Sequence, residues 1–230
     1  IRYTLRLGGT DRRMPDLPTT AMQKPGPRTE QSVTLEVRRA NVTALKTVEA
    51  SAPPAGVREY LRSSPTLNIE DDEIRKMAKK AAGSEKRPYF LADKLRVYVT
   101  DVITEKNLNI GFATASEVCR TREGDCSEHA VLLAALGRAN GLPSRVVVGL
   151  AYVRSFGGKK NVFGFHMWTQ FYIGDQWIDF DAALRESDCS PARIALAISA
   201  LNTAAVGDIA FSIVNVISGL KVEIDAIETR

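Results

Sequence analysis

Cys126 stands where a loop enters a strongly apolar segment, and this position is suited to a nucleophile. The residues from Ala130 to Leu136 are all apolar, which is typical of a helix buried on nearly all sides. The first turn of a helix presents unpaired N–H groups and positive dipole potential, which favour a thiolate and can hold an oxyanion. A buried structural cysteine is the alternative, and at this position alone the two interpretations are equally supported.

A thiol nucleophile needs a base, and the chain contains two histidines, His129 and His166. His129 lies three positions after Cys126 on the same predicted helix. A base one turn inside a buried helix would compete with the substrate for space, because helical side chains lean toward the N-terminus. We therefore expect His129 to be a packing residue and His166 to be the base.

The strand that carries His166 is predicted to be half of a hairpin. Residues 165–173 and 176–180 have the composition of strands, and the Gly174-Asp175 pair between them suits a two-residue turn. With such a turn, Ile173 pairs with Gln176, and every later pair along the hairpin follows from that one.

This register selects the carboxylate that would orient the imidazole. Trp168 then faces Asp181, so Asp181 is diagonal to His166 on one face of the sheet, at roughly 7 Å between backbones. Asp179 pairs with Gln170, two positions further along. We therefore expect Asp181 to fix the tautomer of His166 and to stabilise its protonated form. A turn residue at the end of the strand is the alternative for Asp181.

Three blocks of sequence surround these residues in chain order. They are Gly124 to Ala130, then Leu136, Arg138, Ala139 and Gly141 to Arg145, and finally His166 to Trp168 with Trp177 to Asp181. Together they resemble the transglutaminase-like core of the papain-like cysteine enzymes, in its bacterial form, over residues 70–185. The resemblance implies a triad of Cys126, His166 and Asp181. The family's Pro-Thr pair after the aspartate is replaced by Ala182-Ala183, which leaves the carboxylate itself in place.

The residues beside the triad are expected to shape the site. Gly124 permits a close approach of the backbone before Cys126, and Asp125 stands next to the thiol. Trp168 is expected to be a core residue or a wall of the cleft that excludes water beside the base. We expect Gly124, Asp125 and Trp168 to line the site.

Helices followed by strands predict an α+β fold, in which the nucleophile helix of a papain-like core packs on an antiparallel sheet. Residues 1–65 are expected to be a β-like segment, the end of a preceding domain, and 66–230 the core, unassigned from about residue 190. The predicted strands are 1–7, 32–37, 144–153, 165–173, 176–180 and the end of 208–227. The predicted helices are 71–83 (capped by Asn68 or Asp71), 93–106, 113–122, 126–140 and 191–201, with loops at 8–27 and 155–160.

Composition limits the classes of protein. The chain has 230 residues, 44% hydrophobic and 25% charged, with a net charge of +4, which is ordinary for a folded globular protein. Basic and acidic residues are interleaved, so we expect a mixed solvated surface and no nucleic acid. No run of about 18 apolar residues occurs, so we expect no membrane insertion. The chain begins at Ile1 and not at Met, so we expect a processed or excised chain from which any targeting signal would be missing.

Other chemistries fit the sequence poorly. Three cysteines do not make a disulfide framework, and a pairing of Cys119 with Cys189 stays open. A zinc site from Cys119, Cys126 and His129 with His166 or Cys189 matches none of the usual ligand spacings. Residues 155–160 lack the spacing of a phosphate loop, and no acidic loop has calcium-ligand spacing. We therefore expect neither a metal nor a cofactor.

The residues and the resemblance together predict cysteine-dependent acyl transfer on amide bonds through a thioester. The reaction would be hydrolysis of a peptide or glutamine-type amide, or transamidation, and the resemblance favours hydrolysis. The alternative is a non-catalytic module that binds proteins or cell-wall peptides. The expected partner is a protein or peptide substrate. The physiological substrate, the oligomeric state and the compartment, bacterial cytoplasm or periplasm, stay open.

Overall fold

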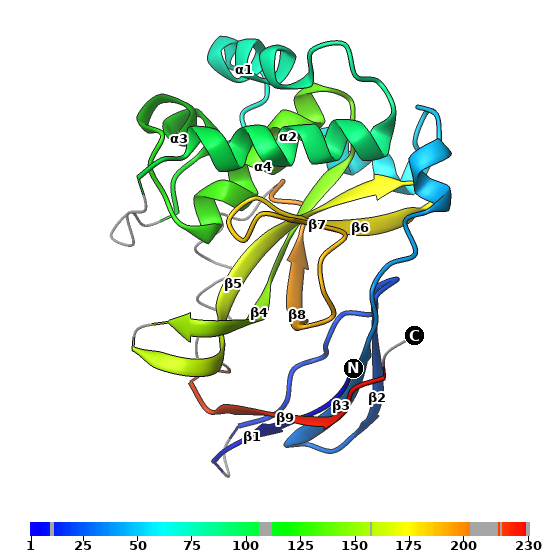
Figure 1. Ribbon diagram of the computed structural model, residues 1–230, viewed down its shortest axis with the longest axis vertical. Coiled ribbons are helices and arrows are strands. Elements are labelled where there is room, and N and C mark those ends of the chain that lie inside the picture. Colours follow the sequence, from blue (N-terminus) through cyan, green and yellow to red (C-terminus); the bar gives the residue numbers. More distant parts are fainter. Residues whose placement is uncertain (10–11, 106–111, 157, 203–215, 217, 229–230) are drawn as a thin grey trace.

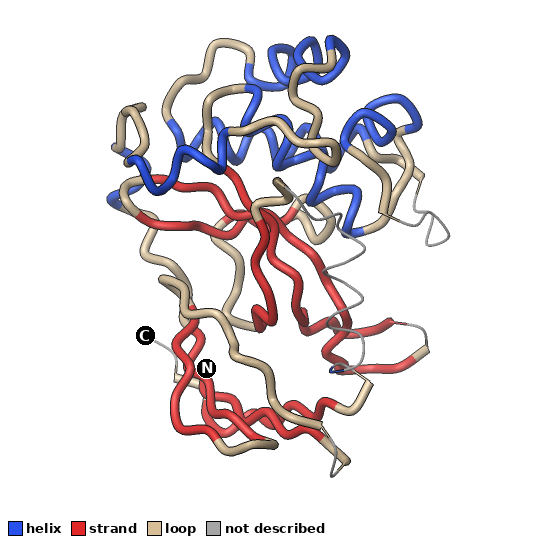
Figure 2. The backbone as a smooth tube through the Cα atoms, turned by 180° about the vertical axis from the view of Figure 1, so that it is seen from behind, coloured by secondary structure: helices blue, strands red, loops and turns tan. Residues whose placement is uncertain are grey.

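A layer of helices and two antiparallel sheets make up the fold (Figures 1 and 2). The computed structural model describes residues 1–9, 12–105, 112–156, 158–202, 216 and 218–228. The helices lie at one end of the molecule, a five-stranded sheet lies in the middle, and a four-stranded sheet lies at the other end (Figure 1). The predicted α+β class is confirmed.

The helices are α1 (Asp72–Ala82), α2 (Pro88–Val102), α3 (Ala115–Thr121) and α4 (Cys126–Ala139), with short 3₁₀ segments η1 (Ala44–Thr47) and η2 (Ala55–Leu61). The first sheet has the order β2-β3-β1-β9, with β1 (Arg2–Leu7), β2 (Gln23–Arg28), β3 (Ser32–Val37) and β9 (Leu220–Ala226). The second has the order β7-β6-β5-β4-β8, with β4 (Ser144–Phe156), β5 (Lys159–Ile173), β6 (Gln176–Asp181), β7 (Glu186–Ser187) and β8 (Arg193–Ser199). Among the described residues, no helix has the length and apolar character needed to cross a membrane.

Helix α4 packs on the strand that carries His166. It is buried along nearly its whole length, as its apolar sequence predicts. Thr169 of β5 donates a hydrogen bond to the carbonyl of Ala130 at 2.9 Å, and Gly137 lies against the ring of Phe171. These contacts set how α4 lies along β5.

The predicted hairpin register is confirmed. Ile173 pairs with Gln176, as the two-residue turn requires. Gly174 and Asp175 have φ values of 54° and 64°, the left-handed conformation that a type I′ turn needs at both positions. The turn residues therefore set which side chains of β5 and β6 share a face.

The segment after residue 190 departs most from the structure that its sequence predicts. Residues 193–199 were predicted as helix, but they form β8, which pairs antiparallel with β4. A short apolar run is compatible with a buried strand or a buried helix, and periodicity alone does not separate them. The edge of β4 selects the strand, since it supplies hydrogen-bond partners for the backbone of residues 193–199.

Three smaller differences have local causes. β2 lies in the predicted loop 8–27; its two prolines are tolerated because β2 is an edge strand. The predicted loop 155–160 is mostly strand, and Gly158, at φ 77°, allows the tight turn. α2 begins at Pro88, a residue suited to the first helical position, and ends at Val102, so the predicted 93–106 was displaced; residue 106 lies outside the described residues.

The two ends of the chain meet in the first sheet. β9 pairs with β1, which confirms the strand alternation predicted near the C-terminus. The side chain of Gln23 in β2 joins this sheet to the second one, because it bonds both the N–H and the carbonyl of Ala195 in β8. The domain boundary near residue 65 stays a prediction.

We predict that Gly137→Ala destabilises the protein by roughly 1–2 kcal/mol, measured by urea denaturation. Helix propensity alone would favour alanine by about 1 kcal/mol. A Cβ at Gly137, however, would lie 2.2 Å from Cε1 of Phe171, so the strand or the ring has to move.

The control is Gly56→Ala, where a Cβ meets no atom within 4 Å and no comparable loss is expected. Phe171→Leu should reduce the cost of Gly137→Ala in the double variant. A stabilised Gly137→Ala variant would show that α4 does not rest on Phe171 as described.

Candidate active site

The loop before Cys126 is held by two carboxylates. Asp125 is the N-cap of α4 and accepts a hydrogen bond from the N–H of Ser127 at 2.8 Å. Glu128 reaches back to the N–H of Asp125 at 2.9 Å, which completes a capping box. Glu128 also accepts from the N–H of Ala113 at 3.0 Å. Cys126, the first residue of α4, therefore follows a turn whose N–H groups donate to both carboxylates.

Gly124 is required by this turn, as the sequence indicates. Its φ of 149° is rare for residues with a side chain, and a Cβ there would lie 2.2 Å from Cβ of Glu128. Gly124 and Asp125 thus shape the backbone that presents Cys126. Whether they contact a substrate stays a prediction.

The environment of Cys126 differs from the one the helix N-terminus alone predicts. Burial raises the pKa of the thiol to about 12, and the Asp125 carboxylate adds to the increase. The N–H of Met167, which donates to the sulfur, opposes it. The two capping acids offset the positive potential of the helix end. A thiolate at Cys126 therefore needs a base to take its proton.

His166 and Asp181 are in direct contact. Nε2 of His166 lies 2.6 Å from Oδ2 of Asp181, and the two residues are 7% and 1% exposed. Nδ1 is then the ring nitrogen that remains to exchange a proton. Met167 follows His166 on β5, and its N–H donates to the Cys126 sulfur, whose pKa the Asp181 carboxylate also raises. The structure therefore places Cys126 against the backbone of β5, near the contact between His166 and Asp181.

Asp181 has two further partners. Its Oδ2 also accepts from Nη2 of Arg193 at 2.6 Å, and Oδ1 accepts from the N–H of Leu184 at 2.9 Å. Burial alone would raise the pKa of this carboxyl, but His166 and Arg193 outweigh burial and hold the pKa below its ordinary value. Asp181 is therefore a buried carboxylate at neutral pH.

Arg193 is the site residue that the sequence analysis missed. It lies in β8, which was predicted as a helix, so no register placed it opposite Asp181. A lone arginine at the head of the apolar run from Arg193 to Ser199 was the available signal, since a buried charge needs a partner.

His129 and Asp179, which were not expected to belong to the triad, have other hydrogen-bond partners. Nδ1 of His129 lies 2.6 Å from the carbonyl oxygen of Asp125, one helical turn back. Asp179 accepts from Nε2 of Gln170 at 2.7 Å, its partner in the register. Trp168 is buried, and its ring stacks with that of His166 at 6.1 Å between centroids. It thus lies beside the imidazole, and its role as a wall of the cleft stays a prediction.

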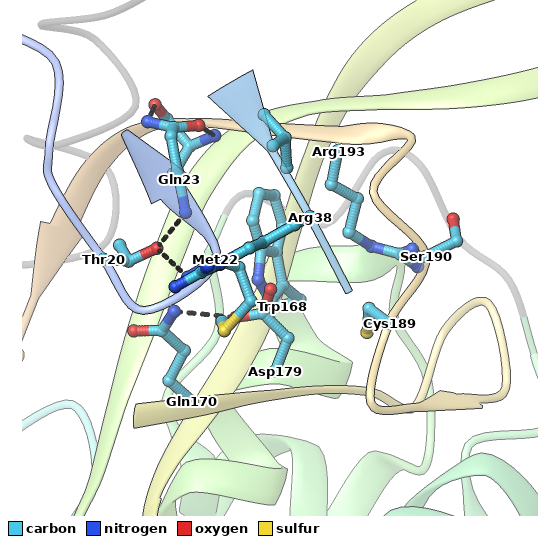
Figure 3. A pocket seen from close by; sticks show the side chains of 12 residues that line it. Thr20, Met22, Gln23, Arg38, Trp168, Gln170, Asp179, Cys189, Ser190 and Arg193 are labelled. Atoms are coloured by element: carbon cyan, nitrogen blue, oxygen red, sulfur yellow. Dashed lines mark hydrogen bonds between the residues drawn. The ribbon is translucent and has the colours of Figure 1, made fainter. Parts of the chain in front are cut away.

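Two described cavities lie apart from the thiol. A cavity of about 10 Å³ separates Thr20, Met22 and Gln23 from Arg193, Cys189 and Ser190 (Figure 3). It has room for about one water molecule. The second, about 390 Å³, lies at the far end of the hairpin beside the Gly174-Asp175 turn. Neither is lined by Cys126 or His166.

The cysteines and acids form no other chemical centre among the described residues. All three cysteines are free thiols, so Cys119 and Cys189 do not pair in this structure. Within the described part of the chain, no group of three or more His, Cys, Asp and Glu side chains is placed to hold a metal ion.

Comparisons with known proteins concern the family and the fold. Residues 75–182 match the model of a family described as the transglutaminase-like superfamily. The fold resembles that of a candidate cysteine protease from Cytophaga hutchinsonii, with a TM-score of 0.63 and 18% identity, over 100% of this chain and 83% of that one. It also resembles the periplasmic domain of TgpA from Pseudomonas aeruginosa, with a TM-score of 0.50 and 16% identity, over 80% and 89% of the two chains. At these identities the likeness shows the fold alone.

Curated relatives occur in mycobacteria. Uncharacterised proteins of Mycobacterium tuberculosis and Mycobacterium bovis are 31% identical over 153 residues, which is 60% of this chain and 48% of each relative. The chain therefore spans about half the length of the curated relatives that it matches.

We predict that Asp181→Asn lowers the free energy of unfolding at pH 7 by about 3 kcal/mol, because it removes the buried one of the two carboxylates that pair with Arg193. The folded pKa of Asp181 is depressed, so its stabilisation is present above the unfolded pKa of about 4 and is lost as the pH falls below it. Urea denaturation of both proteins should show two stability curves that converge toward acidic pH. Asp175→Asn, in the exposed turn, is the control, and a constant difference at every pH would contradict the assignment.

Iodoacetamide should label Cys126 about tenfold or more faster than Cys119 and Cys189, because only Cys126 is not fully buried. His166→Ala should slow this labelling near neutral pH, whereas His129→Gln leaves it nearly unchanged. In His166→Ala the rate should keep rising through pH 10 without a plateau, since burial and the Asp125 carboxylate hold the thiol pKa at about 12. Peptide mass spectrometry measures each site. Equal labelling of the three cysteines, or a plateau near pH 8.5 in His166→Ala, would contradict this account.

Proposed function

Because residues 75–182 belong to the transglutaminase-like superfamily, we propose that this chain is a cysteine-dependent enzyme that transfers the acyl group of an amide through a thioester. The observation that carries the proposal is the buried 2.6 Å contact between Nε2 of His166 and Oδ2 of Asp181. His166 lies on β5, beside Met167, whose N–H donates to the Cys126 sulfur. A nucleophile, a base and an orienting carboxylate are thus available in one place.

The first half of the reaction forms the thioester. His166 takes the proton of the Cys126 thiol at Nδ1 while the sulfur attacks the amide carbonyl carbon. The C=O electrons move to the oxygen, which becomes an oxyanion. When the C–N bond breaks, the imidazolium returns the proton to the leaving nitrogen. Ammonia or an amine departs, and the acyl group stays on Cys126.

The raised pKa of Cys126 fits proton transfer at the moment of attack. A thiol with a pKa of about 12 holds almost no thiolate at neutral pH, so the base has to act during the attack or as the substrate displaces water. The Asp181 carboxylate supports this step, because it holds Nε2 and stabilises the imidazolium that forms.

The second half of the reaction releases the acyl group. His166 removes a proton from water while the water oxygen attacks the thioester carbonyl carbon. The C–S bond then breaks, the imidazolium returns the proton to the Cys126 sulfur, and the carboxylic acid departs. A primary amine in place of water would give a new amide instead. We propose hydrolysis as the principal outcome, on a protein or peptide substrate, in keeping with the compact bacterial form of the core.

A non-catalytic binding module is the second candidate, and one observation favours it. Burial raises the pKa of Cys126, as expected for an inert core cysteine. A module of this kind would keep the His166–Asp181 contact only for stability. The two candidates differ in whether Cys126 ever carries an acyl group.

The test uses glutamine-containing peptides and an activated acyl ester, with and without a primary amine. We expect an acyl adduct on Cys126 by intact-protein mass spectrometry, and release of ammonia or carboxylic acid from the peptides. Cys126→Ala should abolish both, and His166→Ala should lower turnover by roughly 10²-fold or more.

The matched control is Cys119→Ala, which removes a buried thiol from another helix and should retain the adduct. Turnover that persists in Cys126→Ala would refute the assigned nucleophile. A wild-type protein that forms no adduct with any of these donors would favour the binding module. Amine incorporation that exceeds hydrolysis would identify transamidation as the principal reaction.

A further inference from the structure

Arg193 and His166, the proposed base, are hydrogen-bonded to the same oxygen atom of Asp181. Nη2 of Arg193 and Nε2 of His166 both lie 2.6 Å from Oδ2 of Asp181. The side chain of Arg193 is 4% exposed. A cation and an imidazole thus compete for the same buried negative charge.

Glu186 holds the other side of the guanidinium. Nη1 of Arg193 lies 2.9 Å from Oε2 of Glu186, and that carboxylate also accepts from the N–H of Ser190 at 3.2 Å. The Glu186 side chain is 39% exposed. Strands β5, β6, β8 and β7 therefore present a row of four groups, in the order His166, Asp181, Arg193, Glu186.

Other titratable groups surround this row. The charge of Arg193 lowers the pKa of Asp179 in β6, and Cys189, before β8, raises the pKa of Arg193. On the other side, Asp125, Glu128 and Asp181 face Cys126. Of these groups, Asp181 alone is bonded directly to the imidazole in the described part of the chain, so the row through Asp181 is the direct path for charge to reach His166.

The charges in the row alternate, and this has a chemical consequence. An isolated buried carboxylate beside an imidazole stabilises the imidazolium strongly. An imidazole that is already protonated does not take the proton of a neutral thiol. A guanidinium on the same oxygen offsets part of the negative charge, since opposite charges at this separation in a buried site interact strongly.

We infer that Arg193 is a positioning residue that sets the proton affinity of His166 through Asp181, with Glu186 as the group that moderates Arg193. Arg193 keeps Asp181 charged and in place, and it limits how far Asp181 favours the imidazolium. The inference deepens the proposed function and rests on it for its catalytic meaning. Its physical content, the coupling along the row, is measurable without any substrate.

The test follows the titration of His166 by NMR in protein labelled at histidine, with Cys126→Ser as the common background. The chain has two histidines, so His129→Gln assigns both signals. Arg193→Met should move the His166 midpoint to higher pH by about one unit or more, because Asp181 is then unopposed. Glu186→Gln should move it to lower pH, because the Arg193 charge then acts on Asp181 alone. Arg193→Lys, which keeps the charge, should restore most of the wild-type midpoint.

The opposite signs separate this inference from a purely structural role, which would shift neither midpoint in a set direction. Glu223→Gln, an exposed acid of the other sheet, is the matched control and should leave His166 unchanged. If Arg193→Met does not fold, Glu186→Gln decides alone, and an unchanged or higher midpoint in it overturns the inference. Shifts of equal sign in both variants also overturn it. Failure of acyl transfer in the wild-type protein would refute the proposed function without affecting these midpoints.

Discussion

The carboxylate of Asp181 lies almost completely out of water, at 1% exposure, and a charge in that position has to be compensated by its neighbours. His166 from β5, Arg193 from β8 and the N–H of Leu184 supply the compensation. The Asp181 carboxylate thereby joins β6 to β8, which are not adjacent in the sheet. The position of the base, the pairing of β8 and the need for an arginine all follow from this buried charge.

The thiol side of the site is governed by a different balance. Helix α4 begins at Cys126, so the positive end of the helix lies at the thiol, but Asp125 and Glu128 cap the same turn. Their charges and burial keep the thiol protonated. Proton transfer to His166 therefore replaces a preformed thiolate as the source of reactivity. Hydrogen bonds hold the turn before Cys126, and the proposed proton transfer depends on His166 in β5.

Part of this arrangement could be predicted from short stretches of sequence. Gly174-Asp175 sets a two-residue turn, the turn sets the register, and the register places Asp181, not Asp179, within reach of His166. Each step depends on residues that are neighbours in the chain or across one hairpin. The apolar run from Ala130 to Leu136 likewise predicts α4 and its burial, since a helix that is apolar on nearly all sides is buried in the core.

The sequence by itself determined the α+β class, the hairpin register and the contact between His166 and Asp181, because these follow from local backbone preferences and side-chain periodicity. Only the tertiary structure decided that residues 193–199 are a strand, that Arg193 reaches Asp181, and that burial raises the pKa of Cys126. Those properties depend on which distant segments become neighbours. The open edge of β4, the desolvation of a thiol and the pairing of a buried charge all arise from packing, which no local pattern encodes.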